Sequence, residues 1–207
     1  MLYTSRLIKS YSLFMLSLIV MGLGISLVTL AYLGTTPITS PPFTASFSVP
    51  ISFGMLTMLM NFIFVLIQII LLGKEFKREQ YLQLLVGPVL GAAIDGWSLI
   101  ISLYLTENYL VKLGMVILGC IIIALSTIIQ LKANVVNNPA EGIVKAIAYK
   151  TNKEFGDIKL YFDITLVIIA LIISFVTLGE IQGVREGTII SAIIIGPMIR
   201  KFQQVFL

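Results

Sequence analysis

Long uncharged apolar stretches, separated by short polar segments, run through the whole chain. No charged residue lies between Lys9 and Lys74, which leaves room for two helical membrane spans of about 20 residues each and a connection. The same pattern continues toward the carboxyl end and predicts six spans, at residues 11–33, 54–72, 82–105, 113–131, 158–178 and 188–202. We therefore expect an all-α, polytopic helical membrane protein.

The two halves of the chain repeat a set of motifs. Gly87-Pro88 returns as Gly196-Pro197, and three further motifs return 102 positions later: Thr36-Pro37 as Asn138-Pro139, Ser52-Phe53-Gly54 as Glu154-Phe155-Gly156, and Asn61 as Asp163. This predicts a single membrane domain over residues 1–207, with repeat one at 10–106 and repeat two at 111–207. Three spans per repeat is an odd number, so the repeats should cross the bilayer in opposite directions, which is the 3+3 inverted repeat of many secondary transporters.

Basic residues gather on one predicted side of the membrane. Twelve of the fourteen lie on the side that holds both termini, and only Lys112 and Arg185 lie opposite. Because cytoplasmic loops collect Lys and Arg, both termini should be cytoplasmic. The net charge of +4, in a chain with 58% hydrophobic residues, therefore reflects topology, and we expect no nucleic-acid partner.

Several kinds of chemistry lack the residues they need. The chain has no histidine, its one cysteine is Cys120 in an apolar run, and no nucleophile–base pair, metal-spaced cluster or phosphate loop occurs. We expect no enzyme, no cofactor and no metal. The first apolar stretch is longer than a signal-peptide core of about 7 to 15 residues, which favours a retained span.

Two long connections, at residues 34–53 and 133–155, hold equivalent places in the repeats. In the second, Asn138-Pro139-Ala140-Glu141 combines an N-cap, a first-turn proline and a glutamate that closes a capping box, which predicts a short helix to about Tyr149. Thr36-Pro37 begins the first connection similarly, but three later prolines limit a helix there. We expect two short interfacial or re-entrant segments.

Asp95 is the first functional candidate, because it falls inside the third apolar segment. A buried carboxylate in a span is costly unless it is paired or hydrated, and such residues mark solute or proton paths. The alternative is that the span ends early and leaves Asp95 at the interface beside Trp97.

A polar stripe shared by the repeats is the second candidate. Lys159 and Asp163 are four residues apart at the start of the fifth span, and Asp163 matches Asn61 in the second span, with Gln68 two turns further on. The stripe indicates a solute path, or else an interfacial ion pair and a polar contact between helices.

Three other features have both a functional and a structural interpretation. Glu141 and Lys145 share a face of the short helix, and Arg185-Glu186 opens the last span. Gly87-Pro88 and Gly196-Pro197 are predicted helix breaks at matching places. Broken helices at matching positions point to a transporter site, but end caps and packing kinks explain the same residues.

Several motifs also stand together in one known family. They are Leu33-Gly34-Thr35-Thr36-Pro37, Ser52-Phe53-Gly54, residues 68–72, Glu141-Gly142 with Lys145, Phe155-Gly156, Asp163 and, above all, Val184-Arg185-Glu186-Gly187-Thr188. In these the chain resembles the YitT/YczE-type bacterial membrane proteins over nearly its whole length. The resemblance implies a multi-pass protein of the bacterial plasma (inner) membrane and no defined biochemistry.

The features favour a secondary transporter or permease for a small polar or anionic solute. Asp95, Asn61, Gln68 and Asp163 would line its path, and the two short helices would point their N-termini at the solute. The alternative is a non-transporting membrane scaffold or regulatory partner that uses the basic connection at residues 132–159. Both functions place the protein in the lipid bilayer, and both are compatible with a homo-oligomer or a membrane partner protein.

Overall fold

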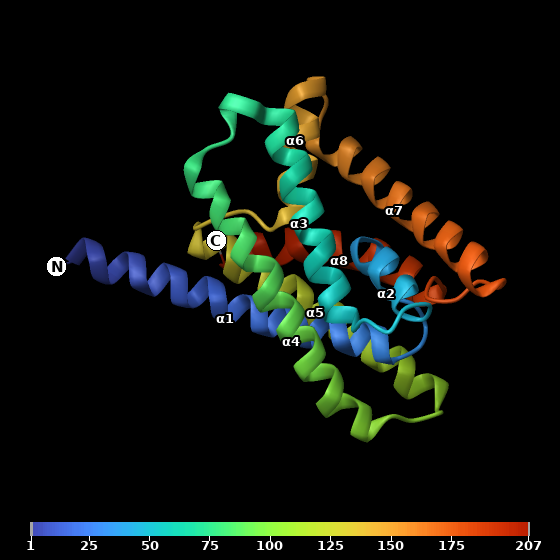
Figure 1. Ribbon diagram of the computed structural model, residues 1–207. Coiled ribbons are helices and arrows are strands. Elements are labelled where there is room, and N and C mark those ends of the chain that lie inside the picture. Colours follow the sequence, from blue (N-terminus) through green and yellow to red (C-terminus); the bar gives the residue numbers. More distant parts are fainter. Residues whose placement is uncertain (1, 207) are drawn as a thin grey trace.

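Helices make up most of the protein in the computed structural model, which describes residues 2–206, with side chains from Ile8 onward (Figure 1). Within that range there are six long helices, α1 (Leu2–Leu30), α3 (Phe53–Leu72), α4 (Gln83–Ile101), α5 (Tyr109–Ala133), α7 (Phe155–Leu178) and α8 (Glu186–Phe206), and two short ones, α2 (Ser40–Ser46) and α6 (Pro139–Thr151). A 3₁₀ turn, η1 (Pro37–Thr39), precedes α2. Each long helix contains a stretch long and apolar enough to cross a membrane, which confirms the six predicted spans and indicates a multi-pass membrane protein.

The helices pack in corresponding pairs. α1 lies along α5. α1 also packs on α4, and α5 packs on α8 in the corresponding way. α2 packs on α7 and on α3, while α6 packs on α3 and on α7. One pair departs from this pattern: α3 packs along α4, but α7 and α8 have no comparable contact within residues 2–206.

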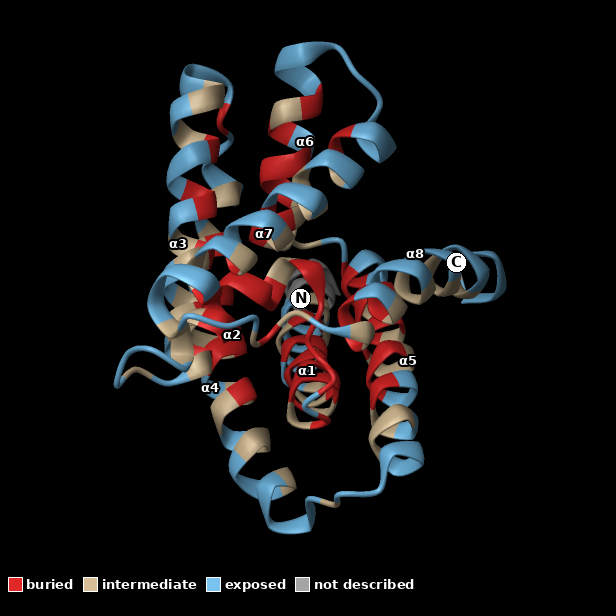
Figure 2. Cartoon of the chain, turned by 90° about the vertical axis from the view of Figure 1, so that its right-hand side faces the viewer, coloured by how far each residue is buried: buried red, intermediate tan, exposed pale blue. Residues whose placement is uncertain are grey.

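The core lies where α1, α4 and α5 meet. Met21, Ile25, Val28, Ile94 and Val116 are part of one buried cluster there. Figure 2 shows buried residues on α1, α2, α5 and α6, whereas α8 is largely exposed along its length. Since apolar side chains cover the exposed faces of α7 and α8, these faces suit contact with lipid.

Glycines allow the closest helix contacts. A Cβ atom on Gly24 of α1 would lie 2.9 Å from the carbonyl oxygen of Gly119 on α5, and one on Gly54 of α3 would lie 2.1 Å from that of Gly91 on α4. No larger residue fits at these backbone separations. Small residues at such crossings are typical of helices that associate by packing in a membrane.

The predicted helix after Asn138 is present as α6. The side chain of Asn138 is the N-cap and accepts a hydrogen bond from the backbone N–H of Ala140 at 3.2 Å. The predicted capping box does not form, because Glu141 makes no bond back to Asn138 in the described chain. The Glu141 side chain instead faces a cavity.

The first connection also forms a helix. Pro41 and Pro42 lie in the first turn of α2, where a missing backbone N–H costs nothing. The expectation that these prolines limit a helix is therefore corrected, since here they start one. Both are buried, with α2 packed between α3 and α7.

The helix breaks expected at Gly87-Pro88 and Gly196-Pro197 do not occur. Both prolines lie inside continuous α-helices, α4 and α8. A proline removes one intrahelical hydrogen bond, and both helices continue on either side of it.

Candidate functional site

A cavity of about 440 Å³ opens among the helices, a volume within the usual range of small-molecule sites. It lies between α7 and α8 and reaches inward to α1, η1, α3 and the start of α6. Its wall is mostly apolar, with side chains such as Met21, Ile25, Phe64, Leu90, Ile123 and Ile195. Its polar side chains come from several helices: Thr36, Thr39, Thr57, Asn61, Thr127, Asn138, Glu141, Lys159, Asp163, Ser191 and Arg200.

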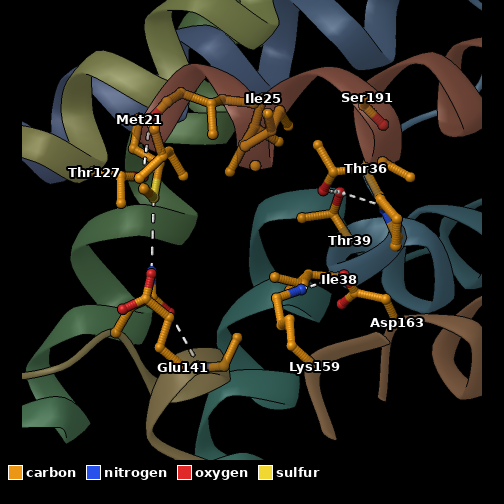
Figure 3. Close-up of a pocket in the computed structure, with 18 of the residues that line it drawn as sticks. Met21, Ile25, Thr36, Ile38, Thr39, Thr127, Glu141, Lys159, Asp163 and Ser191 are labelled. Carbon is orange, nitrogen blue, oxygen red and sulfur yellow. Dashed lines mark hydrogen bonds and ion pairs between the residues drawn. The ribbon is translucent and has the colours of Figure 1, made fainter. Parts of the chain in front are cut away.

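Lys159 and Asp163 form an ion pair on the cavity face of α7 (Figure 3). The two side chains are 28% and 23% exposed, so the pair is partly desolvated. Oδ1 of Asp163 is buried and has no hydrogen-bond partner among residues 2–206. This oxygen is therefore a hydrogen-bond acceptor at the cavity wall that has no donor among the described residues.

Asn61 supplies the opposite kind of group. Its residue is 5% exposed, it lines the cavity, and its Nδ2 finds no acceptor in the described chain. A buried amide without a partner costs roughly 1 to 3 kcal/mol. The repeat mates Asn61 and Asp163 therefore bring an unsatisfied donor and an unsatisfied acceptor to one cavity.

Glu141 is the second carboxylate of the cavity wall. It forms no ion pair or hydrogen bond with the side chains that the structure describes, and in Figure 3 it lies at the end of the view opposite Met21 and Ile25. Burial raises the pKa of Glu141, while the nearby Lys145 and Lys159 act in the opposite direction. Lys145 itself donates to Oδ1 of Asn137 at 2.5 Å and is exposed.

Both short helical segments begin at the cavity. Thr36 shares a 2.7 Å hydrogen bond with Thr39, and the Asn138 amide donates to Sδ of Met21 at 3.6 Å. Thr36, Pro37 and Asn138 line the cavity, whereas Pro139 is buried beside it. Gly196 and Pro197 line it from α8, while Gly87 and Pro88 lie on α4 away from it.

Asp95 lies outside the cavity. Its carboxylate accepts hydrogen bonds from the backbone N–H of Gly54 at 2.8 Å and from Oγ of Ser52 at 2.5 Å. α4 continues past it to Ile101, so the helix does not end at Asp95. The carboxylate satisfies free N–H groups at the start of α3 and complements the helix dipole there.

Gln68 also lies outside the cavity. Its side chain exchanges two hydrogen bonds with Gln83, at 3.1 and 3.2 Å, and donates to the carbonyl of Pro139 at 3.1 Å. One buried amide thereby joins α3, α4 and α6. Gly142 makes this possible, because a Cβ there would lie 2.4 Å from Oε1 of Gln68.

Arg185 and Glu186 hold the start of α8. Arg185 contacts Glu186 at 3.2 Å and donates to the carbonyl of Tyr32 at 3.2 Å. The backbone N–H of Gly187 donates to the carbonyl of Leu33 at 2.6 Å. The motif at residues 184–188 thus fixes α8 to the end of α1, away from the cavity.

Several cavity residues were not among the sequence candidates, including Thr39, Thr57, Thr127, Ser191 and Arg200. Ser191 is fully buried, and Arg200 is exposed at the cavity margin. Arg200 lies one helical turn beyond Gly196, so the Gly-Pro motif was the available signal for it.

The fold and cavity define a class: a multi-pass helical membrane protein with a partly polar cavity among its spans. The chain belongs to the DUF6198 family, a family of unknown function whose model matches residues 8–204. No curated protein and no solved structure matches the chain significantly. The family match spans nearly the whole chain, and the narrower YitT/YczE-type resemblance and the bacterial origin remain predictions.

Proposed function

We propose that the protein is a secondary transporter built from two inverted repeats, and that it carries a small polar or anionic solute through the cavity between α7 and α8. The corresponding helix contacts support this plan, since each of the larger helix contacts has a counterpart under the repeat except that of α3 with α4. Alternating access requires that two helices of one repeat are in contact while the matching helices of the other repeat are apart.

The residues of the closed contact give the strongest support. Gly54 lies against Gly91, and Gly87 lies against Met58 and Asn61, where α3 meets α4. The repeat offsets are 102 positions for α3 to α7 and 109 for α4 to α8. They match these five residues with Gly156, Leu160, Asp163, Gly196 and Arg200, and all five line the cavity.

The matched glycines differ in what they face. A Cβ on Gly54 or on Gly87 would meet α4 or α3 within 3.2 Å, whereas one on Gly156 or on Gly196 would meet nothing within 4 Å. α7 and α8 therefore have the small residues for a close crossing without making one. Arg200 occupies the position in α8 that Gly91 occupies in α4, so α7 and α8 would pack less closely than α3 and α4 do.

A second, alternative state of the transporter follows if the two halves exchange their conformations. α8 is anchored at its start through Arg185 and Gly187, so in the second state its far end, with Gly196 and Arg200, would swing toward α7 about this anchor. With the expected positive-inside orientation, Lys159 and Arg200 are cytoplasmic and the described state opens to the cytoplasm. Closing α7 on α8 while α3 leaves α4 would open the cavity to the other side.

Solute exchange by purified protein in proteoliposomes tests the function. We expect counterflow of at least one small polar or anionic metabolite from a broad panel. The variant Leu160→Cys/Gly196→Cys, made with Cys120→Ala, should form a disulfide that blocks exchange, and a reductant should restore it. Either cysteine alone is the matched control. Absence of exchange for every solute, or full exchange with the disulfide formed, would overturn the proposal.

A further inference from the structure

Glu141 is the acid of the cavity wall that lacks an ion-pair partner in the described chain. Four charged residues line the cavity, two acids and two bases: Glu141, Asp163, Lys159 and Arg200. Asp163 is held by Lys159. The charges sum to zero when Glu141 is ionised, and to +1 when it carries a proton.

The capping-box explanation for a glutamate at this position fails. A third-position glutamate would close a capping box, but Glu141 makes no such bond in the part of the chain described, and Asn138 caps α6 without it. Its carboxylate faces the cavity instead. A charge there is costly and tends to be kept for function.

The groups that face Glu141 favour an anion once its charge is removed. Of the helices that pack on α6, α3 brings the neutral amide of Asn61 to the cavity and α7 brings the Lys159–Asp163 pair. The amides of Gln68 on α3 and Gln83 on α4 are neutral and bond to each other outside the cavity. Lys145 lies on α6 itself, and Arg200 lies on the α8 wall. Neutral Glu141 would also leave the positive end of α6 uncompensated.

The unpartnered Nδ2 of Asn61 is a second, independent indication of the ligand. A hydrogen-bond donor that is buried and free at the cavity wall calls for an acceptor, and an anionic oxygen is a strong one. The apolar wall formed by residues such as Met21, Phe64 and Ile195 suits a hydrocarbon body behind that oxygen.

We infer that the solute is a small organic monoanion with an apolar body, and that it moves together with one proton bound to Glu141, an inference that rests on the proposed transport function. Water on one side of the membrane donates the proton to the Glu141 carboxylate, which becomes a neutral carboxylic acid. After the change of state the proton returns to water on the other side. One anion and one proton carry no net charge across the membrane.

Benzenesulfonate, hexanoate and phenylacetate are suitable probes in proteoliposomes that contain the full chain. Benzenesulfonate stays ionised at every pH used and does not leak through lipid as a neutral acid. We expect an outwardly acidic pH gradient to raise initial uptake severalfold, and an imposed membrane potential to leave it unchanged. With Glu141→Gln, the remaining movement should be independent of pH and should respond to the potential.

Thermal stabilisation by benzenesulfonate gives a readout that does not need transport. In the wild type it should weaken as pH rises through the pKa of Glu141, whereas in Glu141→Gln it should be flat, and Glu141→Asp should keep the pH dependence. Exposed Glu107→Gln is the matched control. Exchange that ignores pH, or exchange confined to neutral and cationic solutes, would overturn this inference and leave transport standing. No exchange of any solute would overturn both.

Discussion

Gly54 and Gly91 touch backbone to backbone, since a Cβ added to Gly54 would lie 2.1 Å from the carbonyl oxygen of Gly91. Gly156, the match of Gly54 in the second half, has open space at the same position. These two equivalent glycines therefore differ in their packing: Gly54 lies in the close contact of α3 with α4, whereas Gly156 on α7 makes no such contact with α8.

This difference predicts opposite results for the same substitution. Gly54→Ala should destabilise the protein by roughly 1 to 3 kcal/mol, because the added methyl forces α3 away from α4. Gly156→Ala should leave stability within about 1 kcal/mol, since nothing meets the new atom and alanine favours helix. Thermal unfolding of both variants in the same detergent measures the difference. Equal losses of stability in the two variants would contradict the open space beside Gly156 on α7.

Much of the fold was predictable because each span is a local property of the sequence. Runs of apolar residues of the right length gave the six helices, and Asn138-Pro139 gave the start of α6. The prolines at 41 and 42 were misjudged because their effect depends on position: in a first turn they favour a helix, and further in they break one.

The site was less predictable because it depends on which helices meet. Lys159 and Asp163 pair within one helix, so their spacing indicated the contact. The partners of Asp95 are on α3, 41 and 43 positions away, and nothing in the sequence fixes that register. Glu141 fits a capping box by pattern, and only the packed structure shows its side chain at a cavity with Asn61.

Asp95 should matter for stability and not for the solute. Asp95→Ala removes two hydrogen bonds and a favourable charge at the start of α3, which should cost about 1 to 2 kcal/mol. The affinity for any cavity ligand should stay within a few-fold of the wild type. Thermal unfolding with and without that ligand measures both quantities. A complete loss of ligand stabilisation would show that Asp95 acts at the site.

Gln68 and Gln83 form a pair suited to a double-mutant cycle. Gln68→Leu alone leaves the Gln83 amide and the Pro139 carbonyl unpaired in a buried setting, at a cost of roughly 1 to 3 kcal/mol. Adding Gln83→Leu removes the orphaned amide, so the double variant should regain part of that loss. Chemical or thermal unfolding of the two single variants and the double variant gives the coupling energy. A strictly additive result would argue against the amide pair.

Substitutions of Lys159 and Asp163 should affect protein stability and ligand affinity differently. Lys159→Gln leaves Asp163 as an unpaired charge in a partly buried wall, and Asp163→Asn does the same to Lys159, so each should lower stability by roughly 1 to 3 kcal/mol. The double variant removes both charges and should be more stable than either single one. Its cavity keeps the same net charge as the wild type but loses the Lys159 cation from the α7 wall. An anionic ligand that stabilises the wild type should therefore bind the double variant at least several-fold more weakly. Thermal shifts measured at several ligand concentrations report stability and affinity from one set of samples. Unchanged affinity in the double variant would place the anion away from α7.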